Sequence, residues 1–310
     1  MDRITCNVCP HACRLKVGEI GACGARGYFP DEGFVKEICY DRSRYEEVGN
    51  RKELCREQSI PLGYGIATSL ALDPIEKKPL NRFYPGSRIL SFGSFGCNLK
   101  CPFCQNHEIS MQSVKSYDPE AMKDAYLSPE RLAEIALKYR DRGNIGVAFT
   151  YNEPLINHEY IADTALLLRN SGLKTVLVTN GCVNPEIADQ LLPYVDALNI
   201  DLKCFREENY RKVLKGDLEA VKSFIIKASG SCHVELTTLI VPGLNSSPEE
   251  TEEIARWVAS LEGGEEIPLH ISRFFPRFHM TDTAPTDVSL IRELAAIAGK
   301  YLKYVYTGNL

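Results

Sequence analysis

From about Arg88 to the last residue, short apolar segments alternate with longer amphipathic ones, and this alternation is what most constrains the fold. Parallel strands need long crossover connections, which are usually helices. We therefore predict an α/β fold, a partial (βα)6 TIM-like barrel, with a doubly wound open sheet as the alternative. The six expected strands are Ile89–Phe92, Ile145–Thr150, Thr175–Thr179, Ala197–Asp201, Val234–Val241 and Pro268–Phe274. In such a barrel the reactive side chains gather at the carboxyl ends of the strands.

Three helix starts can be located from their capping residues. Ser128 precedes Pro129, and a hydroxyl followed by proline in the first turn is typical of a helix start. Ser247 and Glu250 predict a capping box, in which each side chain bonds the amide of the other residue. Asp287 precedes the last helical pattern.

The first part of the chain has a different character, with turn-rich cysteine spacing, a charged stretch and a proline-punctuated connector. We expect residues 1–86 to form an N-terminal cysteine-rich module with its connector, and residues 87–310 to form the α/β core.

Charge and hydropathy exclude some classes of protein. The chain has 36 Lys and Arg against 41 Asp and Glu, a net charge of −5, so nucleic acid is not favoured as a partner. Its apolar runs are far shorter than the roughly 20 residues that span a bilayer. The first residues carry no basic segment followed by an apolar run, as a secretory signal would. We expect a cytoplasmic protein.

Twelve cysteines are many for such a chain, and nine of them lie in the first 104 residues. In a reducing compartment, clustered cysteines bind metal or react more often than they form disulfides. Cys97, Cys101 and Cys104 lie within eight residues, directly after the first expected strand. They can hold three irons of a 4Fe–4S cluster and leave the fourth without a protein ligand. The alternative is a structural zinc site completed by His107.

A second group of cysteines lies near the amino terminus. Cys6, Cys9, Cys13 and Cys23 supply four thiols, a complete ligand set for zinc or for a second iron–sulfur cluster. His11 is a spare ligand, and four unligated thiols are the alternative. The remaining cysteines are isolated, and we expect small buried apolar side chains at Cys39, Cys55, Cys182, Cys204 and Cys232.

The spacing of the triad, with the aromatic Phe103 before the third cysteine, resembles the signature of the radical S-adenosylmethionine (SAM) superfamily. The resemblance implies that the open iron binds the amino and carboxylate groups of SAM. It also implies reductive cleavage of SAM to a 5′-deoxyadenosyl radical, which abstracts hydrogen from a substrate. Burial of the site would keep water and oxygen from the radical.

The resemblance also predicts residues that bind the cofactor, namely Phe103 in the triad loop and others after successive strands. Where the superfamily often carries Gly-Gly-Glu, this chain has Asn152-Glu153, and Glu153 can accept from the ammonium of SAM. The alternative for Glu153 is an acid that caps a helix. Residues expected to contact the methionine carboxylate and the ribose are Thr179, Asn180, Asp201 and Lys203. Asp201 and Lys203 should point to the same side of their strand, although a plain ion pair would explain them equally.

His270 is a further candidate for cofactor binding, with a core histidine as the alternative. Together with the N-terminal cysteine motif and the connector Ala71–Pro79, the segments Thr150–Pro154 and His270–Pro276 resemble the radical SAM member of the AmmeMemoRadiSam system, which is similar to pyruvate formate-lyase activating enzymes.

That resemblance implies Memo-type and AMMECR-type partners and reduced flavodoxin or ferredoxin as electron donor. It favours an activase acting on a partner protein. The alternatives are a radical SAM enzyme that modifies RNA or a small molecule, and a zinc-binding scaffold without redox chemistry.

Overall fold

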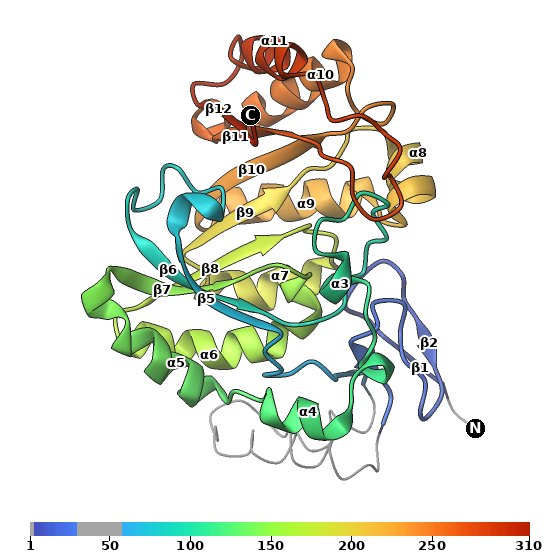
Figure 1. The fold of residues 1–310 in the computed structure, drawn as a ribbon, viewed down its shortest axis with the longest axis vertical. Helices are drawn as coiled ribbons and strands as arrows, with labels where there is room; N and C mark the ends of the chain where they lie inside the picture. The colour runs from blue at the N-terminus through green and yellow to red at the C-terminus, as the bar shows by residue number, and fades with distance from the viewer. Residues whose placement is uncertain (1–2, 30–57) are drawn as a thin grey trace.

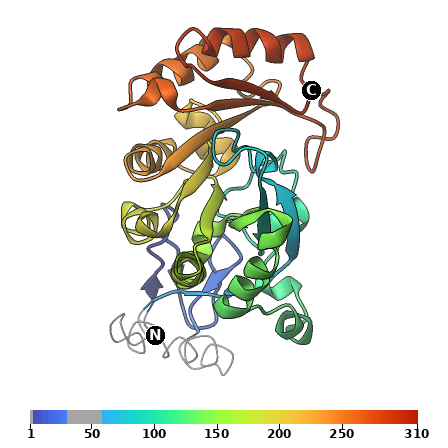
Figure 2. The same cartoon turned by 90° about the vertical axis from the view of Figure 1, so that its left-hand side faces the viewer.

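The computed structural model describes residues 3–29 and 58–310, so Cys39 and Cys55 lie outside the described residues. In the described part, eight strands form one sheet in the order β12-β11-β10-β9-β8-β7-β6-β5. The sheet curves, and helices cover its outer face (Figures 1 and 2). The strands are β5 (Ser69–Pro74), β6 (Arg88–Gly93), β7 (Asn144–Phe149), β8 (Lys174–Thr179), β9 (Ala197–Asp201), β10 (His233–Ile240), β11 (Leu269–Arg273) and β12 (Val305–Gly308).

All six predicted strands are present as β6 to β11, and they pair in parallel. The predicted fold class, a partial barrel, is therefore confirmed. Two strands were not predicted: β12 extends the parallel run, and β5 pairs antiparallel with β6. The main sheet thus begins at Ser69, ahead of the domain boundary expected after residue 86.

The predicted capping residues start helices. The Oγ of Ser128 accepts from the Arg131 amide at 3.2 Å, and that of Ser247 accepts from the Glu250 amide at 3.1 Å. The capping box is only half formed, because the Glu250 carboxylate accepts instead from the amide of Phe205, at 2.6 Å. The helices are α3 (His107–Ser110), α4 (Pro119–Asp124), α5 (Pro129–Lys138), α6 (His158–Asn170), α7 (Pro185–Leu191), α8 (Glu207–Asn209), α9 (Leu218–Ser229), α10 (Pro248–Ala259) and α11 (Val288–Ala298). Within the described residues, no helix is both long and apolar enough to cross a membrane.

The connector between β5 and β6 fills the floor of the barrel, at the amino ends of the parallel strands. Ile75 and Leu80 are fully buried there against strand residues such as Ile89 and Val176. The carbonyl of Pro79 accepts from Asn199 Nδ2 of β9 at 2.9 Å. The connector therefore closes the end of the barrel opposite to the carboxyl ends of the strands.

The N-terminal module contributes two small antiparallel sheets of two strands each, β1 (Ile4–Thr5) with β2 (Arg14–Leu15), and β3 (Arg26–Gly27) with β4 (Ile60–Pro61). Figure 1 shows this module beside α3 and the carboxyl ends of the central strands. It docks through main-chain contacts, among them the bond from the Asn184 amide to the Val8 carbonyl at 3.0 Å.

Candidate active site

A cavity lies at the carboxyl ends of the parallel strands, where a barrel of this type places its chemistry. Its lining combines three thiols, two carboxylates, one ammonium and several neutral polar side chains. Among the lining residues are Cys97, Cys101, Phe103, Cys104, Tyr151, Asn152, Glu153, Thr179, Asn180, Asp201, Lys203, Thr237, Ser272 and Asn309. Seven of the eight predicted cofactor-binding residues and all three cysteines of the triad thus meet in one cavity.

The triad occupies the loop between β6 and α3. Burial raises the pKa of the Cys97 thiol far above its ordinary value, and the nearby Glu153 and Cys101 add to the shift. Burial also raises the pKa of Cys101 to about 11, although Lys203 opposes the shift. The Cys97 Sγ accepts from the Leu99 amide at 3.4 Å.

These donors fit an iron–sulfur cluster. Thiolates are soft ligands that iron–sulfur clusters select, and a bound cation stabilises the deprotonated form that burial alone disfavours. His107, the proposed fourth zinc ligand, stacks on Phe278 with ring centroids 4.7 Å apart, and its Nδ1 lies 3.3 Å from the Cys104 carbonyl oxygen. Among the described residues, no three His, Cys, Asp or Glu side chains converge on a single-ion site.

Glu153 is a fully buried carboxylate at the end of the loop that follows β7. Its Oε1 accepts from Thr179 Oγ1 at 2.6 Å and from the Leu155 amide at 3.0 Å, and its Oε2 accepts from the Asn180 amide at 2.8 Å. Burial raises its pKa to about 7, although these three bonds oppose the shift. The capping role that was the alternative for Glu153 is therefore present, because Leu155 belongs to the 3-10 turn Pro154–Asn157.

Asn180 connects Glu153 to the cluster loop. Its Nδ2 donates to Asn98 Oδ1 at 2.9 Å and lies 3.6 Å from the Cys97 Sγ. Thr179, the last residue of β8, points its hydroxyl at Glu153. Both side chains are buried, so the loop after β8 is held against the triad by polar contacts.

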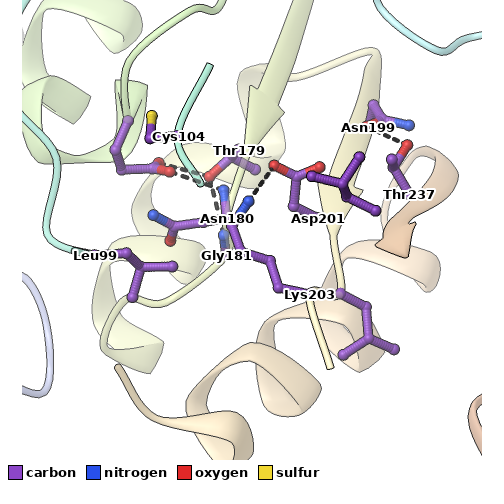
Figure 3. A network of polar contacts seen from close by, with 12 residues as sticks. Leu99, Cys104, Thr179, Asn180, Gly181, Asn199, Asp201, Lys203 and Thr237 are labelled. Carbon is purple, nitrogen blue, oxygen red and sulfur yellow. Dashed lines mark hydrogen bonds and ion pairs between the residues drawn. The ribbon is translucent and has the colours of Figure 1, made fainter. Parts of the chain in front are cut away.

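Asp201 and Lys203 lie on the same side of the chain at the end of β9, as their alternation predicted. The Lys203 Nζ donates to Asp201 Oδ2 at 2.8 Å, an ion pair that Figure 3 shows beside Asn180 and Thr179. Burial alone would lower the pKa of Lys203, but Asp201 and the Cys101 thiol raise it well above its ordinary value. The pair that was the alternative explanation exists, and both of its members still line the cavity.

The structure does not bring His270 to this cavity. His270 is the second residue of β11 and therefore lies near the amino end of its strand, on the floor side of the barrel. Its Nε2 is 2.7 Å from Glu235 Oε2, and its ring stacks on Tyr306. Here His270 is a core residue with a buried polar partner, which was the alternative interpretation.

Sequence reasoning missed the far wall of the cavity, where Thr237, Ser272 and Asn309 line it. The sequence did contain a signal for Thr237 and Ser272. Both lie on predicted strands, and every second side chain of a strand faces the same side of the sheet. The register places Thr237 beside Asp201, so it points to the interior as Asp201 does. Asn309 follows the unpredicted strand β12 and gave no signal.

The N-terminal cysteines meet the triad loop through the main chain of Cys23, whose carbonyl accepts from the Cys97 amide at 3.1 Å. Cys6, Cys9 and Cys23 are buried and Cys13 is half-buried. Burial raises the pKa of Cys9 to about 12, and Cys6, Cys23 and Cys182 add to the shift. As expected of isolated cysteines, Cys182 and Cys204 are buried, and Cys232 is half-buried.

Comparison with known proteins decides the family. Residues 92–258, more than half of the chain, match the family profile of the radical SAM superfamily. The chain belongs to the radical SAM superfamily. The match begins in β6 and ends in α10, so it contains the triad and all seven lining residues predicted to bind the cofactor.

The chain is also similar to individual curated proteins and to solved structures. An uncharacterized protein from Methanocaldococcus jannaschii is 36% identical, over 100% of this chain and 82% of its own length. The pyruvate formate-lyase-activating enzyme of Clostridium pasteurianum is 26% identical, over 60% of this chain and 75% of its own length. In fold, the chain resembles SuiB from Streptococcus suis in its SAM-bound structure, with a TM-score of 0.53, 14% identity and coverage of 90% of this chain and 61% of SuiB. The protein is a radical SAM enzyme, and this superfamily uses a 4Fe–4S cluster and SAM.

Proposed function

We propose that this radical SAM enzyme is an activase, the radical member of an AmmeMemoRadiSam-type system, which abstracts hydrogen from a partner protein. The observation that carries the proposal is the similarity to an activating enzyme over most of that enzyme's length. The cavity supports it, because the wall formed by Thr237, Ser272 and Asn309 is polar but uncharged, as suits the amide groups of a protein segment.

In this proposal Cys97, Cys101 and Cys104 hold the cluster, and Phe103 packs beside it. When bound, the cluster supplies the electron that cleaves SAM reductively and so yields the 5′-deoxyadenosyl radical. Asn152 and Glu153 bind the amino end of SAM. The carboxylate and the ribose are bound by Thr179, Asn180, Asp201 and Lys203.

The contacts of these residues explain what the chain itself contributes. Glu153 is held by three donors, so its carboxylate is oriented before any ligand arrives. Lys203 places a positive charge near the thiol of Cys101, which compensates part of the negative charge of a thiolate-bound cluster. Buried walls exclude water from the reacting atoms.

For Cys6, Cys9, Cys13 and Cys23 we propose a second metal centre, zinc or an iron–sulfur cluster, on the ground of their spacing in the sequence, since the described residues show no ready single-ion site. Reduced flavodoxin or ferredoxin is the proposed electron donor, and Memo-type and AMMECR-type proteins are the proposed partners. A cytoplasmic location agrees with a chain rich in free thiols.

The test is anaerobic reconstitution with iron and sulfide, followed by reaction with SAM, reduced flavodoxin and each candidate partner. We expect 5′-deoxyadenosine by chromatography and a glycyl-type radical in one partner by electron paramagnetic resonance. Deuterium from a glycine-labelled partner should appear in the 5′-deoxyadenosine. Cleavage of SAM without any signal in a partner, but with deuterium from RNA or a small molecule, would overturn the activase assignment. Cys232→Ala is the control for replacement of the triad cysteines, and it should react as the wild type does, since Cys232 is not among the residues that line the cavity.

A further inference from the structure

A buried polar network connects the cavity to the connector in the barrel floor. The Tyr151 hydroxyl donates to Asp73 Oδ2 at 2.6 Å. The same oxygen accepts from Lys78 Nζ at 2.8 Å and from Ser91 Oγ at 2.8 Å. The Lys78 Nζ also lies 3.3 Å from the Tyr151 hydroxyl oxygen and 4.5 Å from the centre of its ring. Tyr151 lines the cavity, so the network lies directly beneath the site.

Lys78 and Asp73 form a charged pair in the interior. Lys78 is 1% exposed and Asp73 is 6% exposed. Burial raises the pKa of Asp73, but its bonds from Lys78, Tyr151, Lys77 and Ser91 together hold that pKa well below its ordinary range. Burial and the bond to Asp73 raise the pKa of Tyr151 to about 12, so the phenol keeps its proton and donates it. A buried ion pair gives less stability than a packed apolar pair, which points to a role in fixing one conformation.

The backbone of Tyr151 is in the left-handed region, at φ 73°, which is rare for a bulky residue. Its ring passes over Gly93 of β6, where a Cβ atom would come within 2.9 Å of the Tyr151 Cδ2. Such a conformation persists only where the surroundings determine it. Asp73 Oδ2 and Lys78 Nζ, which both bond the Tyr151 hydroxyl, supply that determination at the hydroxyl end of the ring.

The two residues that follow Tyr151, Asn152 and Glu153, line the cavity and contact the triad loop. Asn152 Nδ2 donates to the carbonyl of Gly96 at 3.2 Å, and Asn152 Oδ1 accepts from the Ser94 amide at 3.1 Å. The Glu153 amide donates to the Gly96 carbonyl at 3.3 Å. The direction in which the chain leaves Tyr151 therefore decides how Asn152 and Glu153 meet the cluster loop.

The connector fixes the other end of the network. Lys78 lies between Ile75, buried in the floor, and Pro79, whose carbonyl accepts from Asn199. The amides of Asn81 and Arg82 donate to the carboxylate of Glu235 on β10, at 3.0 and 2.7 Å. The main chain next to Lys78 is thus bonded to the neighbouring strands, and the Lys78 side chain is buried between this connector and Tyr151.

We propose that Tyr151 is a positioning residue which, anchored to Asp73 and Lys78 of the connector, holds Asn152 and Glu153 in the conformation that binds the amino end of SAM. The proposal rests on the proposed assignment of Glu153 to that end of the cofactor. It gives the buried pair in the barrel floor a function in cofactor affinity, at a distance from the cofactor itself.

The test uses the full chain reconstituted anaerobically, with Tyr151→Phe, Lys78→Met and Tyr151→Gly. The Kd for SAM is measured by equilibrium dialysis with the oxidised cluster, so that no turnover occurs. We expect Kd to rise about tenfold in Tyr151→Phe and Lys78→Met, which corresponds to one lost hydrogen bond in a charged network. Iron content and the absorbance of the cluster should equal those of the wild type. Tyr151→Gly, which suits the left-handed backbone but lacks the anchor, should bind no better than Tyr151→Phe.

In steady-state cleavage of SAM, the same variants should raise KM more than they lower kcat. Tyr84→Phe is the matched control, because Tyr84 also has a positive φ of 47° but is half exposed, and it should keep the wild-type Kd. Wild-type Kd values in both Tyr151→Phe and Lys78→Met would overturn the proposal. Should either variant lose iron, Ser91→Ala, which removes one donor to Asp73, serves as the milder probe and should raise Kd at least twofold.

Glu153→Gln distinguishes a failure of the SAM-binding role of Glu153 from a failure of the positioning role of Tyr151. If Glu153→Gln keeps the wild-type Kd, the assignment of Glu153 fails. If Glu153→Gln weakens SAM binding and Tyr151→Phe does not, only the positioning role of Tyr151 fails.

Discussion

The amide of Cys97 donates a hydrogen bond to the carbonyl of Cys23 at 3.1 Å, so the main chain joins the first cysteine of the triad to the last cysteine of the N-terminal motif. Next to it, His11 Nε2 lies 2.7 Å from the carbonyl oxygen of Asn98. These contacts hold the N-terminal module on the triad loop at two adjacent residues, Cys97 and Asn98. Order in one cysteine group is therefore linked to order in the other.

Gly96→Ala should break this link. Gly96 has φ 83°, and a Cβ atom there would stand 2.6 Å from the Cys23 carbonyl oxygen. We expect lower iron content and faster proteolysis of the N-terminal module. Gly86→Ala is the control, because Gly86 has φ 81° and nothing lies within 4 Å of the added Cβ. Its loss of unfolding free energy, about 1 kcal/mol, therefore comes from backbone strain alone. Equal loss of unfolding free energy in the two variants would contradict the link.

Replacing Cys97, Cys101 and Cys104 by alanine should remove the cluster and abolish SAM cleavage. Since the N-terminal thiols form a separate set, any metal that they bind should remain, as measured by metal analysis. If the folded triple variant also lost the metal of the N-terminal thiols, the prediction would be wrong, and metal binding at the two sites would be coupled.

The iron-free protein should lose stability as the pH rises through the neutral range because of Glu153. Its pKa is raised from 4.5 to about 7, so between these values the native state binds more protons than the unfolded state. The contribution is complete below about pH 4.5 and is lost above about pH 7, with a size of about 3 kcal/mol. Denaturant unfolding at pH 5 and pH 8 measures it. Relative to wild type, Glu153→Gln should show a flatter profile, and parallel profiles would argue against the shift.

Ser247→Ala should reduce the free energy of unfolding by about 1 kcal/mol, because the Oγ of Ser247 caps α10 through the Glu250 amide. Ser229→Ala is the comparison, since its exposed hydroxyl bonds only a carbonyl of the preceding turn. A change in Ser229→Ala as large as that in Ser247→Ala would contradict the capping role.

The sequence predicted the parallel strands because each is a short apolar run buried on both faces. It did not predict β5, whose six residues are mostly half-buried or exposed and end in proline, or β12, which has four residues. Neither segment has a run of buried apolar residues long enough to distinguish a strand from a loop in the sequence. Both are strands because a neighbouring strand offers them a hydrogen-bonding edge.

For the site, strand ends were a sufficient guide where the residue is the last of its strand, as with Thr179 and Asp201. The error at His270 arose because the segment carries several polar residues, and only the structure shows that Ser272 lines the cavity whereas His270 lies against the buried Glu235. Glu250 shows the same limit, since its partner Phe205 lies in a distant loop that local capping rules do not consider.

The direction of β5 has a consequence for the whole enzyme. Because β5 runs opposite to β6, with Ser69 beside Gly93, the N-terminal module is tethered at the reactive end of the barrel. A parallel strand in the same place would attach it to the other end, about 20 Å away. Reversing one edge strand would thus carry Cys23 away from Cys97 and remove the main-chain bond between them.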